Sequence, residues 1–334
     1  MVSIQWLRAL AVTMVIVFHV LLKAHILGFT ELTFSQGAAG VDLFFIISGF
    51  IMIYITRGRD FAFFDFMTRR VMRIIPFYWL VSGVVCVVYL YNPNLVNSHN
   101  GETHLLSSLL LLPIQDKVML LEVGWTLRYE FLFYISFAFS ALLFRNPLNY
   151  CVISIVVITI TSLIKINNFY VQYFTNPLML EFLFGITLYY LLNKTTKIIG
   201  FISLTLGVAM LIFFGFSGYG LQNRVIYYGL PMFLISLGLI SFEDIIKSSK
   251  KRASQFISYL GDASYSLYLT HTLVIGVVAK ISTLFNVSLA PYLFVPLSVI
   301  TSVIVGLMSY ELIEKPMVRF MKNLNLGPNA ATSH

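Results

Sequence analysis

The chain has 334 residues, of which 58% are hydrophobic and only 11% are charged, and its net charge is +8. A soluble domain averages about 25% charged residues, so the composition excludes a water-soluble fold of this size. The excess of Lys and Arg is typical of the short cytoplasmic loops of membrane proteins. No basic run has the aromatic spacing of a nucleic-acid-binding module. We therefore expect an all-α integral membrane protein with no nucleic-acid partner.

Hydropathy predicts about ten transmembrane helices, because apolar runs of the roughly 17 to 25 residues that cross a bilayer recur along the whole chain. The first run is expected to be a retained helix and not a signal peptide, since no basic region precedes it and Arg8 lies inside it. We predict one membrane domain at 1–320, followed by a short cytoplasmic tail at 321–334. The predicted spans are 4–22, 40–56, 74–91, 124–144, 149–164, 176–192, 198–216, 223–241, 261–284 and 291–312.

The distribution of basic residues between alternate loops orients these spans. One set of loops, together with the C-terminal tail, holds most of the Lys and Arg residues. The other set holds only Lys23, Lys117, Lys165 and Arg224, with Lys280 near a helix end. Because basic residues collect on the cytoplasmic side, we expect both the N-terminus and the C-terminus to be cytoplasmic.

Two connections are longer than a hairpin needs. The segment at 57–73 is predicted to be an amphipathic helix on the cytoplasmic surface. Its apolar face comprises Phe64, Met67, Val71 and Ile74, and its basic face comprises Arg69, Arg70 and Arg73. On spacing alone, the three arginines suit a phosphate clamp as well as they suit a topology signal or a site for anionic lipid. The apolar piece at 105–114 is too short to span and is predicted to be re-entrant or interfacial.

The first predicted span contains two ionisable residues, Arg8 and His19. Each such residue costs a few kcal/mol inside a bilayer unless it is paired or hydrated. Their eleven-residue spacing brings them within about 20° of a common helix face and separates them by about 16 Å along the axis. Two costly groups aligned in this way favour a lined cavity over a snorkelling Arg and an unrelated, packed His.

Other polar residues are predicted at a depth similar to that of His19. Glu130 lies inside the fourth span and Asp42 begins the second. A carboxylate beside a His is the usual arrangement of a general base. We favour Glu130 as the partner of His19 because it is deeper, whereas Asp42 is equally suited to capping its helix. His271, in the ninth span, is interpreted either as a second cavity-lining group or as a packed His hydrogen-bonded to a neighbouring helix.

Six segments, in this order along nearly the whole chain, resemble those of the membrane acyltransferase 3 family, particularly its bacterial exopolysaccharide acetyltransferase branch. They are IQWLRALAVTMVIVFH at 4–19, GVDLFFIISGFIM at 40–52, RRVMRIIPFYW at 69–79, WTLRYEFLFY at 125–134, SYSLYLTH at 264–271 and ELIEKP at 311–316. The resemblance implies ten transmembrane helices in the bacterial cytoplasmic (inner) membrane. It also implies transfer of an acyl group, usually acetyl, from acyl-CoA to a sugar hydroxyl.

The resemblance also implies roles for individual residues. The Arg-x10-His motif of the family falls on Arg8 and His19, and His19 is expected to be the general base for the acceptor hydroxyl, aided by Glu130 or Asp42. An acyl-His intermediate is the competing mechanism. The phosphates of the donor, acetyl-CoA or another acyl-CoA, are expected to bind Arg8, Arg69, Arg70 and Arg73.

The acceptor, a glycan or lipid-linked oligosaccharide, is expected to contact Trp125, Arg128 and His271. Arg128 departs from the family pattern at a variable position, where it suits either an anionic acceptor or snorkelling to the outer interface. We expect no permanently bound cofactor and no metal site.

Two other classes of function are compatible with the pattern. A proton-coupled multipass transporter of a glycan or small solute also buries His and carboxylate residues, although no paired half-repeats with interrupted helices are visible. A non-catalytic membrane component that presents a lipid-linked glycan is the second alternative, distinguished by insensitivity to loss of His19. The sequence leaves the oligomeric state open, with a homo-oligomer among the options.

Overall fold

The computed structural model describes residues 1–58, 61–96, 102–144, 147–164, 166–217, 223–249, 251–284 and 291–323. Within these ranges the chain is helical, and its β-pairing is limited to an isolated bridge between Thr103 and Val118. The expected all-α class is therefore confirmed for the described part of the chain. The chain divides into two compact units, the first formed by Met1–Ile55 and Leu180–Tyr310 and the second by Thr56–Met179 and Glu311–His334.

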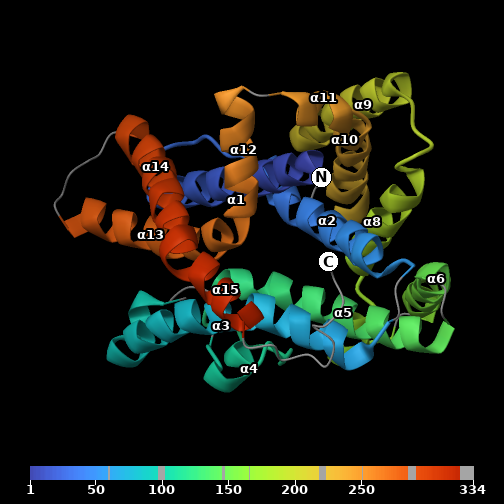
Figure 1. Cartoon of the computed structure of the whole chain (residues 1–334). Coiled ribbons are helices and arrows are strands. Elements are labelled where there is room, and N and C mark those ends of the chain that lie inside the picture. The colour runs from blue at the N-terminus through green and yellow to red at the C-terminus, as the bar shows by residue number, and fades with distance from the viewer. Residues whose placement is uncertain are drawn as a thin grey trace. The chain divides into compact units, whose positions relative to one another are not determined.

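The first unit is built from two separate parts of the chain, the N-terminal segment and a later one. Its elements are α1 (Val2–Ile26), η1 (Ser35–Ala38), α2 (Ala39–Thr56), α8 (Met179–Leu191), α9 (Lys197–Ser217), η4 (Val225–Gly229), α10 (Leu230–Ser241), α11 (Glu243–Ser248), α12 (Arg252–Asp262), α13 (Ser264–Leu284) and α14 (Pro291–Ser309). Helix α1 packs against α12, α13 and α14 (Figure 1). It ends where Gly28 adopts a φ of +70° and the Phe29 N–H donates to the Ala24 carbonyl, a left-handed helix stop that glycine accommodates best.

Helices α2 and α8 of the first unit touch backbone to backbone. A Cβ atom on Gly49 would meet the carbonyl of Phe182, and one on Gly185 would meet the carbonyl of Ile46. Small residues at such crossings let two helices approach closely, which is a common way to pack helices in membranes. Because Asp42 lies in the first turn of α2 and α8 carries Glu181, this close approach also brings two acidic side chains into one region of the unit.

The second unit comprises the middle of the chain and its C-terminal end. Its elements are α3 (Phe63–Tyr91), η2 (Pro93–Leu95), α4 (Leu105–Leu109), η3 (Glu122–Gly124), α5 (Trp125–Phe144), α6 (Pro147–Ile164), α7 (Phe169–Phe174), η5 (Tyr310–Glu314) and α15 (Lys315–Asn323). Helix α3 packs against α5 and α15, and α5 packs against α6. The fully buried aromatic residues Phe77, Tyr78, Phe133 and Phe137 lie on α3 and α5.

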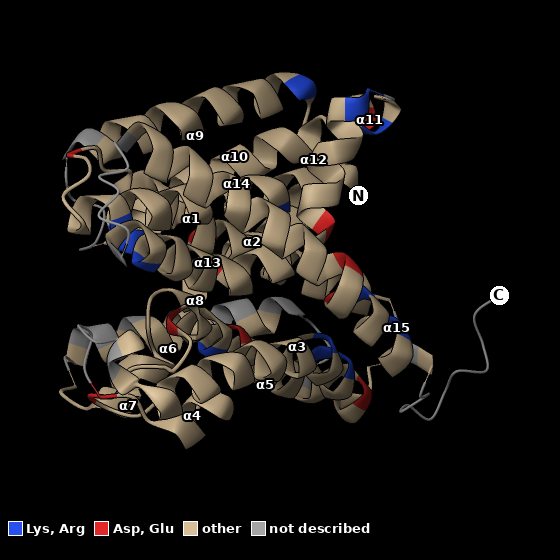
Figure 2. Ribbon diagram, turned by 90° about the vertical axis from the view of Figure 1, so that its left-hand side faces the viewer, with Lys and Arg blue, Asp and Glu red and all other residues tan. Residues whose placement is uncertain are grey.

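All ten predicted spans fall on helical elements, and seven helices in the described ranges are long and apolar enough to cross a membrane. They cover Val2–Ile26, Ser35–Thr56, Phe63–Tyr91, Glu122–Leu143, Lys197–Gly215, Ser264–Thr283 and Tyr292–Met321. Figure 2 shows how few charged residues interrupt α9 and α10. The protein is therefore a multi-pass membrane protein. Spans at 149–164, 176–192 and 223–241 fall on helices outside this set, so the count of ten stays a prediction, as does the orientation of the termini.

The structure changes the bounds of two predicted helices. The amphipathic helix predicted at 57–73 is not separate, because α3 runs without a break from Phe63 to Tyr91. Its buried stripe of Phe66, Ile74 and Phe77 continues across the predicted boundary, so a single helix buries it. The predicted piece at 105–114 is helical only over Leu105–Leu109, beyond which Leu111 turns the chain with a φ of +56°.

The connection before the ninth span also contains structure that the sequence analysis did not predict. Two short helices, α11 and α12, occupy it, and α13 begins at Ser264 instead of residue 261. Helix α12 packs on α1, where Gly261 meets the Gln5 carbonyl. Hydropathy missed α12 because it is amphipathic and not continuously apolar.

Candidate active site

Two histidines meet where α1 packs against α13 in the first unit. His19 Nδ1 lies 3.2 Å from His271 Nε2, and the two ring centroids are 4.9 Å apart at an interplanar angle of 61°. His271 is fully buried, whereas His19 is only partly buried. The structure thus pairs the predicted base with the residue that was interpreted as a second cavity-lining group.

The partners of the two rings define their neutral tautomers. His271 Nδ1 lies 2.7 Å from the Tyr268 carbonyl, and His19 Nδ1 lies 3.0 Å from the Val15 carbonyl. A carbonyl only accepts, so both Nδ1 atoms carry the hydrogen. His271 Nε2 then accepts from His19 Nδ1–H. In this arrangement Nε2 of His19 keeps its lone pair, and it is the nitrogen that can take up a proton.

Arg8 lies on the same face of α1 as His19. Its Nε donates to Ser264 Oγ at 3.1 Å, and Nη1 donates to Gln5 Oε1 at 3.3 Å. Gln5 in turn donates to Asp262 at 2.6 Å. Since both Arg8 and His19 contact α13, the predicted common stripe on the first helix is confirmed.

Asp42 lies in a buried charged cluster of the first unit. Arg224 donates to Asp42 through Nε at 2.9 Å and through Nη2 at 2.7 Å, and Asp42 is fully buried. Glu181 is also fully buried and interacts with both residues. One guanidinium balances one carboxylate, and neither carboxyl oxygen of Glu181 has a hydrogen-bond partner among the described residues, so the cluster buries one acid more than Arg224 can neutralise.

Glu181 is not among the residues predicted from the sequence, and Arg224 was predicted only as one of the basic residues in a loop. Glu181 lies inside the apolar segment at 176–192, so the rule that singled out Glu130 would have found it. Arg224 precedes the π-helix η4 directly, and no sequence signal joins it to Asp42, which lies 182 residues earlier.

In the second unit, Glu130 belongs to a polar group on α3 and α5. The Tyr134 hydroxyl donates to Glu130, and Arg70 lies within electrostatic range of both residues. The three arginines of α3 do not form a uniform clamp. Arg69 and Arg73 are exposed, whereas Arg70 turns inward and lies 5.8 Å from the centre of the Phe66 ring. The pairing of Glu130 with His19 stays a prediction.

Trp125 and Arg128 lie in the first turn of α5, also in the second unit. Trp125 packs edge-to-face on Tyr129, with ring centroids 6.1 Å apart. The guanidinium of Arg128 is surrounded by the phenol groups of Tyr78, Tyr129 and Tyr173. The structure therefore brings an arginine and several aromatic rings together at one end of α5.

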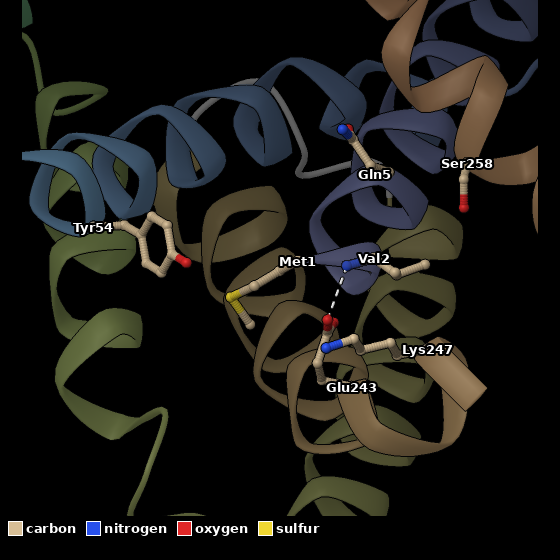
Figure 3. A pocket seen from close by; sticks show the side chains of 7 residues that line it. All are labelled: Met1, Val2, Gln5, Tyr54, Glu243, Lys247 and Ser258. Carbon is tan, nitrogen blue, oxygen red and sulfur yellow. Dashed lines mark hydrogen bonds between the residues drawn. The ribbon is translucent and has the colours of Figure 1, made fainter. Parts of the chain in front are cut away.

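A pocket of about 410 Å³ opens at the N-terminal end of α1 (Figure 3). Its lining residues are Met1, Val2, Gln5, Tyr54, Glu243, Lys247 and Ser258. Glu243 accepts hydrogen bonds from the backbone N–H groups of Val2 at 2.9 Å and Ser3 at 2.7 Å. The carboxylate thus caps a helix N-terminus, where negative charge is favoured. Gln5 connects the pocket to Arg8.

Removing the Glu243 carboxylate is expected to destabilise the junction of α1 and α11. Partial burial raises the pKa of Glu243, but the hydrogen bonds from Ser3 and Val2 outweigh it, so the pKa lies below its ordinary value of 4.5. A lowered pKa means that the stabilisation is present above about pH 4.5 and is lost as the pH falls further. Glu243→Ala should therefore lower the free energy of unfolding by about 1 kcal/mol at pH 7.

Thermal unfolding of the detergent-purified protein between pH 3.5 and 7 checks this prediction. The difference between wild type and Glu243→Ala should shrink towards the acid end. The exposed neighbour Asp244 provides the matched control, since Asp244→Ala should leave the unfolding midpoint unchanged. An equal effect of both variants at every pH would contradict the capping role.

A family profile described as an acyltransferase domain matches residues 1–311. The chain is 32% identical to the exopolysaccharide production protein ExoZ of Rhizobium meliloti over 298 residues, which cover 86% of this chain and 91% of that protein. No solved structure matches the chain.

Proposed function

The chain belongs to the acyltransferase domain family, and from this premise we propose that it is an O-acetyltransferase acting on a glycan. The donor is acetyl-CoA from the cytoplasm, and the acceptor is a hydroxyl of an exported or lipid-linked glycan at the bacterial inner membrane. The likeness to an exopolysaccharide production protein supports the glycan acceptor.

The observation that carries this proposal is the pairing of His19 with His271. Nε2 of His19 takes the proton of the acceptor hydroxyl, and the oxygen attacks the thioester carbonyl. The carbon–sulfur bond breaks, and the leaving thiolate takes the proton back from the imidazolium. Throughout these steps, His271 Nε2 accepts a hydrogen bond from His19 Nδ1–H. This hydrogen bond holds the His19 ring and stabilises the positive charge of its imidazolium form, as an orienting carboxylate does in other general-base arrangements.

The donor is expected to enter from the end of α1 that carries Arg8. Arg8 offers a fixed cation, since Ser264 and Gln5 hold its guanidinium in place. The pocket beside Gln5 also presents Lys247, and both groups suit the phosphates of a coenzyme A ester. In the second unit, the exposed Arg69 and Arg73, together with Arg70, are also proposed to bind phosphate groups of the donor, as the sequence resemblance implies.

The direct test uses membranes that contain the protein and matched membranes that lack it. Each is incubated with [14C]acetyl-CoA and glycan extracts from a host without the protein. Label in an alkali-labile glycan fraction, found only with the protein, is the expected result. If neither acetyl-CoA nor succinyl-CoA labels the glycan although the protein is inserted, the proposed function is wrong.

His271 is expected to act as a positioning residue for His19. His271→Phe removes the acceptor nitrogen while filling the buried space, and it should lower kcat by about 100-fold with little change in KM. His271→Asn, which retains an acceptor, should recover part of the activity and shift the acid limb of the pH–rate profile. If His271→Phe raises KM for acetyl-CoA or the glycan and leaves kcat unchanged, the positioning role is contradicted.

A further inference from the structure

Arg128 is the one arginine of α5 in the described ranges, and its hydrogen-bonding capacity is not met. Its Nε and Nη2 atoms are shielded from solvent, and the described part of the chain supplies no hydrogen-bond partner to either. The side chain as a whole keeps intermediate exposure, so it remains reachable. A buried charged donor left without a partner costs more than a lost neutral hydrogen bond. The guanidinium is thus suited to a partner that the described residues do not provide.

The surroundings of Arg128 are phenol groups instead of carboxylates. Its electrostatic neighbours in the second unit are Tyr173, Tyr78 and Tyr129. The Tyr78 hydroxyl already donates to the Ser108 carbonyl at 2.6 Å. The rings of Tyr129 and Tyr173 stack with centroids 4.9 Å apart, which fixes the wall next to the guanidinium.

The Tyr129 hydroxyl is oriented so that it still has a proton to donate. The Leu178 N–H donates to Asn176 Oδ1 at 3.0 Å, so the amide nitrogen of Asn176 faces the phenol. That nitrogen donates to the Tyr129 oxygen at 3.0 Å. Because the Tyr129 oxygen is already accepting, its own O–H points elsewhere, and Arg128 and Tyr129 together present donors only.

We propose that Arg128 and Tyr129 bind an oxyanion, a carboxylate or phosphate group, carried by the glycan acceptor. This inference rests on the proposed function for the identity of the acceptor, but the anion site itself does not depend on turnover. A planar guanidinium binds carboxylate and phosphate through two parallel hydrogen bonds. Acceptors that lack the anion are then discriminated against, which makes Arg128 a determinant of acceptor specificity.

Binding is tested first, without catalysis. The purified protein in zwitterionic nanodiscs is heated with sodium glucuronate, inorganic pyrophosphate or neutral glucose. Glucuronate or pyrophosphate should raise the unfolding midpoint of the wild type and of the exposed control Arg319→Gln, and should not raise it for Arg128→Gln. The anion with the larger shift identifies the carboxylate or the phosphate as the natural group.

Two outcomes of the binding experiment would overturn the proposal. The first is the absence of any stabilisation by either anion in the wild type. The second is stabilisation by phosphatidylglycerol nanodiscs that depends on Arg128 while both soluble anions have no effect, which would assign the guanidinium to a lipid headgroup. Tyr129→Phe keeps the ring and removes the donor, so it tests the site even if Arg128→Gln does not fold, and it should weaken anion binding.

Turnover then links the site to the acceptor. With a uronate-containing glycan, Arg128→Gln should raise the acceptor KM at least about 10-fold and leave the KM for acetyl-CoA unchanged. With the same glycan after chemical reduction of its carboxyl groups, wild type and variant should be equal. An equal loss with both glycans would contradict the specificity role. Failure of the wild type to acetylate any glycan would instead contradict the proposed function, and the binding results would still stand.

Discussion

Replacing His19 with alanine is expected to lower the rate of glycan acetylation by about 100- to 10,000-fold, the usual contribution of a general base. The reason is that, with Nδ1–H of His19 donating to the Val15 carbonyl and to His271, the lone pair of the ring lies on Nε2, which can take up the proton. The variant should still insert, because His19 is only partly buried and its neighbours Val15, Ile16 and Val20 remain packed. Initial rates with [14C]acetyl-CoA, normalised to the amount of inserted protein, measure the effect.

The same helix supplies the control for this experiment. His25 is exposed near the end of α1, where its Nδ1 lies 3.1 Å from the Thr30 carbonyl. His25→Ala should retain full activity. Activity of His19→Ala at the wild-type level would exclude His19 as the base. A burst of acetylated protein that is lost with His19→Ala would favour the acyl-His intermediate over direct transfer.

The second large effect is expected at the buried cluster of Asp42, Arg224 and Glu181. Arg224→Leu leaves two fully buried acids without their counter-charge, and breaking a buried ion pair in this way costs about 3 to 5 kcal/mol. The variant should show a large fall in its unfolding midpoint in detergent and a loss of monodisperse protein.

A second substitution separates charge from packing in this cluster. Adding Asp42→Asn to Arg224→Leu removes the uncompensated charge, so the double variant should recover much of the lost stability. Glu181→Gln alone should be mild, because a neutral amide of the same shape removes one of the two buried acids that share a single guanidinium. If the double variant is as unstable as the single variant, the guanidinium stabilises through packing and not through its charge.

The sequence predicted the features that periodicity and polarity determine. The apolar runs located the helices, and the eleven-residue spacing correctly placed Arg8 and His19 on one face. Periodicity names a face of a helix but not the helix that covers it. The pairing of His19 with His271 depends on a contact across 252 residues, and the pairing of Asp42 with Arg224 depends on one across 182 residues.

The errors in local structure have a related cause. The segment at 57–73 was predicted as a separate surface helix because its apolar and basic residues have amphipathic spacing, although α3 runs on from Phe63 and buries Phe66. The amphipathic helix α12 was missed because a hydropathy window averages its two faces. In both cases the packing partner, which the window does not contain, decides the structure.

The first unit is assembled from two parts of the chain that are far apart in the sequence, and this has a consequence for biosynthesis. When the ribosome has delivered α1 into the bilayer, the helix that carries His271 has not yet been translated. At about 5 to 20 residues per second, the 252 residues between the two histidines take roughly 13 to 50 s to synthesise. During this interval Arg8 and His19 lack their partners on α13, so nascent chains are expected to need shielding by the insertion machinery, and chains interrupted before residue 264 to be targets for membrane proteases.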